Sequence, residues 1–231
     1  EIWIDPNIYK NGLAVTIPGT EGMFGLDTAA ALGAYGGNPT RDLEVLESLD
    51  SETIDKAKKL LEAQQVTVNL REEVGLHVRT KIISDQDTAE SLIVDLHNNI
   101  VSLKLNGKEV TDSPLLAKAK RKGGKRTLAE LEAWLRELTL PEILEMTFQL
   151  DEDDLNILEE GVNHNLALAE YGLKHGSGLG IGKAIDRMIK QKLMVKDMTS
   201  SARRLTSAAA DARMGGAKLP AMSSAGSGNH G

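Results

Sequence analysis

Val101-Ser-Leu-Lys-Leu-Asn-Gly107 alternates apolar and polar residues up to an Asn-Gly pair. Alternation with a period of two is typical of a β-strand that buries one face. The Asn-Gly pair favours a tight turn, because both residues tolerate the positive φ that two-residue hairpin loops require. This stretch therefore predicts a strand followed by a turn, and with it a sheet in this part of the chain.

Strand-like runs also precede this stretch, at residues 65–70, 76–83 and 91–96. Ahead of them, Ser51 is placed to cap a helix whose apolar residues recur at helical spacing. Those apolar residues are Ile54, Ala57, Leu60 and Leu61. Residues 51–112 are therefore predicted to form a small α+β unit of one helix and about four antiparallel strands.

Helical patterns dominate on both sides of this unit. Residues 27–35 are rich in alanine and end at Gly36-Gly37, and Asn38-Pro39 can begin a further short helix. Downstream, helices are predicted from Thr127, from Pro141, after the acidic cluster 151–154, and over 181–198 and 201–213. The predicted fold class is α+β and mainly helical, with a helical body (1–50 and 127–231), a small antiparallel α+β unit (51–112) and a basic linker (113–126).

Composition narrows the classes of function. The 231 residues contain no cysteine, which excludes thiol catalysis and cysteine-ligated metal within this chain. Residues 118–126 hold six basic side chains, either a nucleic-acid patch or a solvated loop. The net charge of −7 favours the loop, and no apolar run approaches the length of a membrane span. We therefore expect a cytoplasmic protein with no nucleic-acid or membrane partner.

Three motifs have a structural and a functional interpretation. Gly176-Ser-Gly-Leu-Gly-Ile-Gly-Lys183 resembles a phosphate loop, but a helix rather than a strand is predicted before it, which favours a tight helix–loop–helix junction. The acidic cluster 151–154 fits a magnesium site or, preferably, the start of a helix. His164, between Asn163 and Asn165, is expected to be a hydrogen-bonded interior or interface group.

The C-terminal segment offers hydroxyl and amide groups among glycines. Ser223, Ser224, Ser227 and Asn229 follow a stretch with a double glycine and a proline. Glycines allow backbone N–H groups to converge on an anion, so such a loop suits an amino-acid carboxylate. A plain Gly/Ser turn is the alternative.

Several of these segments carry a family resemblance. The sequence resembles the L-cysteine desulfidases and the alpha chain of iron–sulfur L-serine dehydratases over nearly its whole length. The segments that carry the resemblance are Asp5-Pro-Asn-Ile-Tyr-Lys-Asn-Gly12, Ile17-Pro-Gly-Thr20, Ala30-Ala-Leu-Gly-Ala34 with Gly36-Gly-Asn-Pro39, and Asp211-Ala-Arg-Met-Gly-Gly-Ala-Lys-Leu-Pro220 with Ser227-Gly-Asn229.

The resemblance implies a lyase that converts L-cysteine or L-serine to pyruvate and ammonia with a [4Fe–4S] cluster. The cluster cysteines of the family lie outside the matched region, so the chain is expected to be a central fragment, inactive alone and without a cofactor or metal of its own. The implied carboxylate-binding residues are Ser223, Ser224, Ser227 and Asn229, with Asn7, Lys10 and Asn11 lining the same pocket. No catalytic residue is assigned. Asp211 and Arg213 are expected to pair and organise the loop.

Two hypotheses follow from the sequence. The first is the fragment of a lyase, whose partner is a small amino acid and which can form a homo-oligomer. The second is a non-catalytic module of the same fold that binds a small amino acid or helps to assemble a larger protein. The sequence also predicts that residues 5–20 and 211–231 meet in one cleft, with Asn7 near Ser227.

Overall fold

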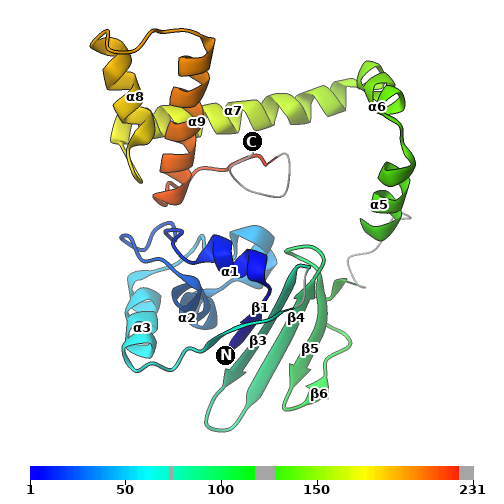
Figure 1. The fold of residues 1–231 in the computed structure, drawn as a ribbon. Helices are drawn as coiled ribbons and strands as arrows, with labels where there is room; N and C mark the ends of the chain where they lie inside the picture. The colour runs from blue at the N-terminus through cyan, green and yellow to red at the C-terminus, as the bar shows by residue number, and fades with distance from the viewer. Residues whose placement is uncertain (73–74, 118–127, 224–231) are drawn as a thin grey trace. The chain divides into compact units, whose positions relative to one another are not determined.

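The structure is a computed structural model that describes residues 1–72, 75–117 and 128–223. The chain forms two compact units, Glu1–Arg136 and Glu137–Gly231. Figure 1 shows a sheet with short helices in the first unit and only helices among the described residues of the second. The predicted fold class, α+β and mainly helical, is confirmed. Among the described residues, no helix is long and apolar enough to cross a membrane.

One six-stranded sheet forms the first unit's β part, in the order β2-β1-β3-β4-β5-β6. Its strands are β1 (Ile2–Ile4), β2 (Val68–Leu70), β3 (His77–Ile83), β4 (Thr88–Val94), β5 (Ile100–Leu105) and β6 (Lys108–Glu109). Asn106 and Gly107 both have positive φ between β5 and β6, so the predicted tight turn is confirmed. The prediction of a purely antiparallel sheet is wrong, because β1 pairs in parallel with β2.

The short strand β1 comes from the start of the chain and completes the sheet. It lies between β2 and β3, where Ile4 is 1% exposed and Ile2 is 7% exposed. A strand of three residues makes few hydrogen bonds, and the burial of both isoleucines adds to its stability. Residues 2–4 thus join the sheet of the unit predicted at 51–112, and the grouping of 1–50 with 127–231 stays a prediction.

The helices of the first unit are α1 (Pro6–Gly12), α2 (Leu26–Gly36), the 3₁₀ helix η1 (Pro39–Glu44), α3 (Ser51–Glu62) and α5 (Leu128–Glu137). Three of them, α1, η1 and α3, begin at a side-chain cap, whereas α2 begins at Gly25 without one. The Asn38 side chain accepts a hydrogen bond from the Thr40 N–H at the start of η1, as predicted. The cap of α3 is Asp50 rather than the predicted Ser51, because the Asp50 carboxylate accepts from the Thr53 N–H. The predicted cap Thr127 lies outside the described residues.

The second unit is built from α6 (Leu140–Met146), the 3₁₀ helix η2 (Thr147–Gln149), α7 (Glu152–His175), α8 (Ile181–Lys190) and α9 (Met198–Met214). Asp151 and Asp154 form a capping box at the start of α7, so these two members of the acidic cluster serve the helix start. The predicted helix over 181–198 is wrong at its end. Lys192 has a positive φ, and Asp197 already caps α9.

Glycines allow α7 and α8 to pack closely against α9 (Figure 1). A Cβ on Gly172 would collide with the Ala208 carbonyl, and a Cβ on Gly182 would lie 2.5 Å from the Ala208 Cα. Gly178 approaches the backbone of Asp211 in the same way, with 2.7 Å from its virtual Cβ to the carbonyl oxygen. The interpretation of residues 176–183 as a tight helix–loop–helix junction is therefore confirmed.

An ion pair links α8 to α9 and makes the stability of this unit depend on pH. The Asp186 carboxylate lies 2.6 Å from the Lys190 ammonium and 2.9 Å from the Arg204 guanidinium. Hydrogen bonding to Lys190, and less strongly to Arg204, lowers the pKa of Asp186 although partial burial opposes this. Because the folded pKa lies below the unfolded pKa of about 4, the stabilisation is present above pH 4 and is lost as the pH falls through the folded pKa.

We expect Asp186→Asn to lower the free energy of unfolding by about 1 kcal/mol at pH 7, since the pair is only partly buried. The difference from the wild type should shrink as the pH falls below about 4. Urea unfolding at pH 7 and at pH 3 measures both values. A difference that stays constant between the two pH values would show that Asp186 acts through packing and not through its charge.

Candidate functional site

Three of the predicted carboxylate-binding residues lie together on α1. Lys10 and Asn11 follow Asn7 by three and four residues, so both lie next to Asn7 on the helix surface, and all three are exposed. The Asn11 side-chain amide donates to the Asn7 amide oxygen at 3.3 Å. This pair and the Lys10 side chain form an exposed polar face of α1.

The buried carboxylate of Asp5 fixes the start of that helix. Its Oδ1 accepts from the N–H groups of Asn7 and Ile8 at 2.9 and 3.1 Å, and its Oδ2 accepts from the His77 N–H of β3 at 3.0 Å. Asp5 is only 2% exposed. This role of Asp5 was not predicted, although an Asp ahead of a proline is a recognisable helix start. Through this carboxylate, the polar face of α1 is held at a fixed position on the sheet.

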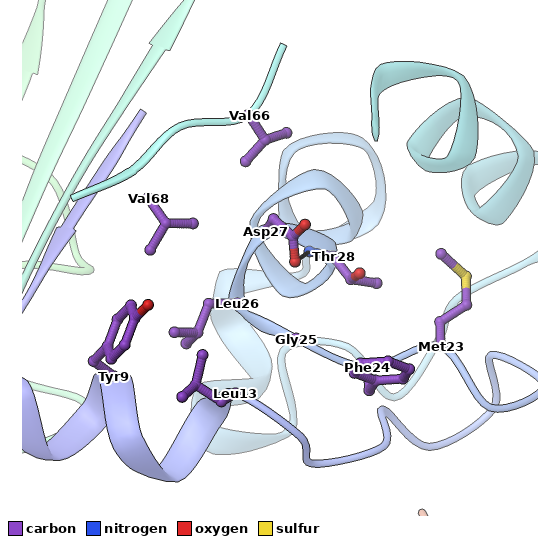
Figure 2. Close-up of a pocket in the computed structure, with 10 residues that line it drawn as sticks. All are labelled: Tyr9, Leu13, Met23, Phe24, Gly25, Leu26, Asp27, Thr28, Val66 and Val68. Atoms are coloured by element: carbon purple, nitrogen blue, oxygen red, sulfur yellow. Dashed lines mark hydrogen bonds between the residues drawn. The ribbon is translucent and has the colours of Figure 1, made fainter. Parts of the chain in front are cut away.

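The first unit also contains an open pocket of about 640 Å³ that was missed from the sequence. Figure 2 shows Tyr9, Leu13 and Leu26 grouped together, with Asp27 and Thr28 at the start of α2. The pocket is lined by Tyr9, Leu13, Met23, Phe24, Gly25, Leu26, Asp27, Thr28, Val66 and Val68. The predicted residues Asn7, Lys10 and Asn11 are not among them, because Tyr9 and Leu13 lie on the opposite face of α1.

A tight turn shapes one wall of this pocket. Thr20, at 1% exposure, donates through its hydroxyl to the Ile17 carbonyl at 2.6 Å, and the Ile17 N–H donates to the Met23 carbonyl at 2.8 Å. Gly25 follows with a φ of +100°, and a Cβ there would lie 2.8 Å from the Asp27 Oδ1. The Ile17-Pro-Gly-Thr20 motif therefore sets the path of residues 23–28 along the pocket.

In the second unit, Asp211 organises the glycine junction. It is 7% exposed, and its carboxylate accepts from the N–H groups of Leu179 and Gly182, each at 3.1 Å. Both of these partners are backbone groups, so Asp211 ties α9 to the junction between α7 and α8. The ion pair that the sequence predicted between Asp211 and Arg213 stays a prediction.

The Gly/Ser segment begins at a well-defined point on α7. The Asn165 side chain donates to the Met222 carbonyl at 3.1 Å and accepts from the Met222 N–H at 3.0 Å. Ser223 comes next in the chain. Ser224, Ser227 and Asn229 lie outside the described residues, as does the basic run 118–126. The predicted approach of Asn7 and Ser227 therefore stays a prediction.

His164 points to a different partner from its neighbour Asn165. Its Nε2 lies 3.4 Å from a Glu160 carboxylate oxygen, one turn earlier on α7. His164 was predicted to be a hydrogen-bonded group, and no role was predicted for Asn165. Asparagine is unfavourable in the middle of a helix, which was the available signal that Asn165 has a specific task.

The residues of this chain do not fit an iron–sulfur cluster. Cluster iron is held mainly by cysteine thiolates, and the sequence contains no cysteine. Among the residues that the structure describes, no three His, Asp or Glu side chains are grouped so as to hold a metal ion.

Comparison with known proteins gives the family. The serine dehydratase alpha chain family matches residues 40–231. UPF0597 protein DP0591 of Desulfotalea psychrophila is 65% identical over 228 residues, which is 99% of this chain and 52% of that protein. A UPF0597 protein of Desulfatibacillum aliphaticivorans is 49% identical over 232 residues, or all of this chain and 53% of that protein.

A more distant relative gives the same picture. UPF0597 protein YhaM of Escherichia coli is 40% identical over 234 residues, covering 52% of its length. The chain thus spans about half the length of the curated relatives it matches. No solved structure matches it significantly. Because the family match covers most of the sequence, including the segment from Asp211 onward, the chain belongs to the serine dehydratase alpha chain family.

Proposed function

We propose that the full-length protein is a lyase that eliminates the β-substituent of L-cysteine or L-serine. Loss of the α-proton together with hydrosulfide or hydroxide, released as hydrogen sulfide or water, leaves an enamine, which tautomerises to an imine and hydrolyses to pyruvate and ammonia. The observation that carries the proposal is the family match over residues 40–231, which includes the whole segment of hydroxyl and amide side chains at 223–229. Membership of this family supports a lyase-like role, and the choice between the two substrates is part of the proposal.

In this proposal the chain contributes the binding of the substrate carboxylate. Hydroxyl groups of Ser223, Ser224 and Ser227 and the Asn229 amide donate hydrogen bonds to its oxygens. The other candidate residues of the proposal, Lys10, Asn7 and Asn11, belong to the first unit and offer one ammonium and two amide groups. Such fixed donors hold the substrate in one orientation, so that the α-proton and the β-substituent are presented to the reacting groups.

A [4Fe–4S] cluster, when bound, would act as the Lewis acid for the leaving group. Since this chain has no cysteine, the thiolates for such a cluster would come from other residues of the longer protein. The proposal therefore divides the work, with the carboxylate held by this chain and the cluster held elsewhere.

We expect this chain alone to be colourless after anaerobic incubation with iron and sulfide, and to release no pyruvate from L-cysteine or L-serine above background. The reason is that no thiolate is present to hold iron. Visible absorbance and a coupled pyruvate assay measure the two results. A brown protein with absorbance near the blue end of the visible range would contradict this division of work.

Binding to the full-length protein tests the carboxylate role directly. Calorimetric titration should show that L-serine binds and that L-serinamide, which lacks the carboxylate, binds at least tenfold more weakly, because charge-assisted hydrogen bonds are lost. Ser227→Ala should lower the affinity for L-serine and leave the affinity for L-serinamide almost unchanged. Equal affinity for the acid and its amide would show that these residues do not bind a carboxylate.

A further inference from the structure

We propose that Asn165 is a positioning residue for the candidate carboxylate-binding segment, residues 223–229. It fixes the place along α7 at which the backbone just before this segment is held. This inference rests on the proposed function. Asn165 itself need not touch the substrate. It acts through the main chain of Met222, one residue before Ser223.

The geometry is that of a two-way clamp. The side-chain amide of Asn165 uses its nitrogen for the Met222 carbonyl at 3.1 Å and its oxygen for the Met222 N–H at 3.0 Å. A side chain with only a donor or only an acceptor makes one of these bonds. Because both bonds go to the same residue, a shift of the segment by one position along α7 would break both.

Packing on the same face of α7 reinforces the register. Gly161, Asn165 and Leu168 are spaced by four and three residues, so they form one stripe along the helix. Leu168 packs with Ala217 in a buried cluster. At the other end of the stripe, a Cβ on Gly161 would lie 2.7 Å from the Met222 Cγ. The segment Ala217–Met222 therefore follows the stripe from Leu168 towards Gly161.

Two features distinguish this arrangement from ordinary core packing. The fixed group is a backbone position immediately ahead of the candidate binding residues, and the fixing group is polar and only partly buried. An apolar residue at 165 could pack against the segment but would leave both the N–H and the carbonyl of Met222 without these partners. An amide at this position fixes the position of the chain along the helix, which is what a binding segment requires.

The experiment compares Asn165→Ala, Asn165→Asp and the control Asn163→Ala in the full-length protein. Asn163 is an exposed asparagine two residues away on the same helix. The two readouts are hydrogen exchange over residues 217–231 and the dissociation constant for L-serine. Asn165→Ala loses both hydrogen bonds to Met222 and should raise the dissociation constant for L-serine roughly tenfold. The increase in hydrogen exchange should be confined to residues 217–231. Asn165→Asp keeps the acceptor, so its dissociation constant and hydrogen exchange should lie between those of the wild type and Asn165→Ala. Asn163→Ala should behave as the wild type.

A second pair of variants tests the same register without touching Asn165. Gly161→Ala should displace Met222 and lower the affinity for L-serine. The double variant Gly161→Ala/Met222→Ala should restore much of the affinity, because it removes the Met222 Cγ and Cε, the two nearest atoms, and leaves only the Cβ, at 3.1 Å. Rescue of this kind is expected of a positioning role and not of general destabilisation.

The outcomes separate this inference from the proposed function. Wild-type protein that binds L-serine, together with Asn165→Ala that binds it equally well, overturns the positioning role alone. Exchange that rises equally in α7, α9 and the segment shows a purely structural role and also overturns it. Wild-type protein that binds neither L-serine nor L-cysteine overturns the proposed function, and the positioning role with it.

Discussion

Gly182→Ala is expected to destabilise the second unit by about 3 kcal/mol, at the upper end of the usual cost of overpacking. The added Cβ would lie 2.5 Å from the Cα and Cβ of Ala208 on α9, and a backbone atom cannot turn away as a side chain can. Gly172→Ala should act similarly, because its Cβ would collide with the Ala208 carbonyl. To avoid these collisions, α9 would have to move away from α8 in Gly182→Ala and from α7 in Gly172→Ala. Either movement would also open the junction held by Asp211.

The placement of tryptophan makes this expectation straightforward to measure. Both tryptophans, Trp3 and Trp134, lie in the first unit, so their fluorescence reports unfolding there, whereas helical circular dichroism also reports the second unit. Gly33→Ala on α2 is the control. Nothing lies within 4 Å of its virtual Cβ, so alanine should stabilise α2 by about 0.5–1 kcal/mol. Loss of less than about 1 kcal/mol in Gly182→Ala would contradict the close packing of α8 on α9.

Asp211→Ala is expected to cost about 3 kcal/mol, since it removes a charged acceptor from two backbone N–H groups. Those N–H groups belong to Leu179 and Gly182, and the carboxylate is 7% exposed, so water can replace it only in part. Asp211→Asn keeps one acceptor oxygen and should lose less. Urea unfolding monitored by circular dichroism gives both values.

Asp153→Ala is the matched control for that loss, because Asp153 is an exposed acidic residue in the first turn of α7. It should cost no more than about 0.5–1 kcal/mol through the helix dipole. A cost for Asp211→Ala no larger than that of the control would show that the junction does not depend on the buried carboxylate.

Much of the fold could be predicted because it follows from local patterns. The alternation at 101–105 and the Asn106-Gly107 turn depend on neighbouring residues, and so does the capping box at Asp151. The place of β1 could not be predicted in this way. It is three residues long, and its partners at 68–70 and 78–80 are distant in sequence, so no periodic signal shows which strand it joins.

The end of α8 was missed for a similar reason. The apolar pattern of residues 181–198 continues past Lys190, but Lys192 takes a positive φ and Asp197 starts a new helix. An Asp or Ser within a polar stretch is a helix cap in one context and a surface residue in another. Only the packing of α8 on α9 decides between them.

The candidate site could be predicted in part. The family resemblance singled out Asn7, Lys10 and Asn11, and the structure places all three on α1, while their role in carboxylate binding stays a prediction. The pocket around Tyr9 and Asp27 was missed, because its walls come from three separate segments. Asn165 was missed because its partner, the backbone of Met222, carries no side-chain signature in the sequence.

Pyruvate release by the full-length protein, reconstituted anaerobically with iron and sulfide, tests the central claim most directly. The wild-type protein should release pyruvate from L-cysteine or L-serine, and Ser227→Ala should lower kcat/KM at least tenfold, mainly through KM, because the substrate carboxylate loses a hydrogen-bond donor. Absence of pyruvate from both substrates, or a Ser227→Ala protein as active as the wild type, would contradict the assignment of this segment to substrate binding in a lyase.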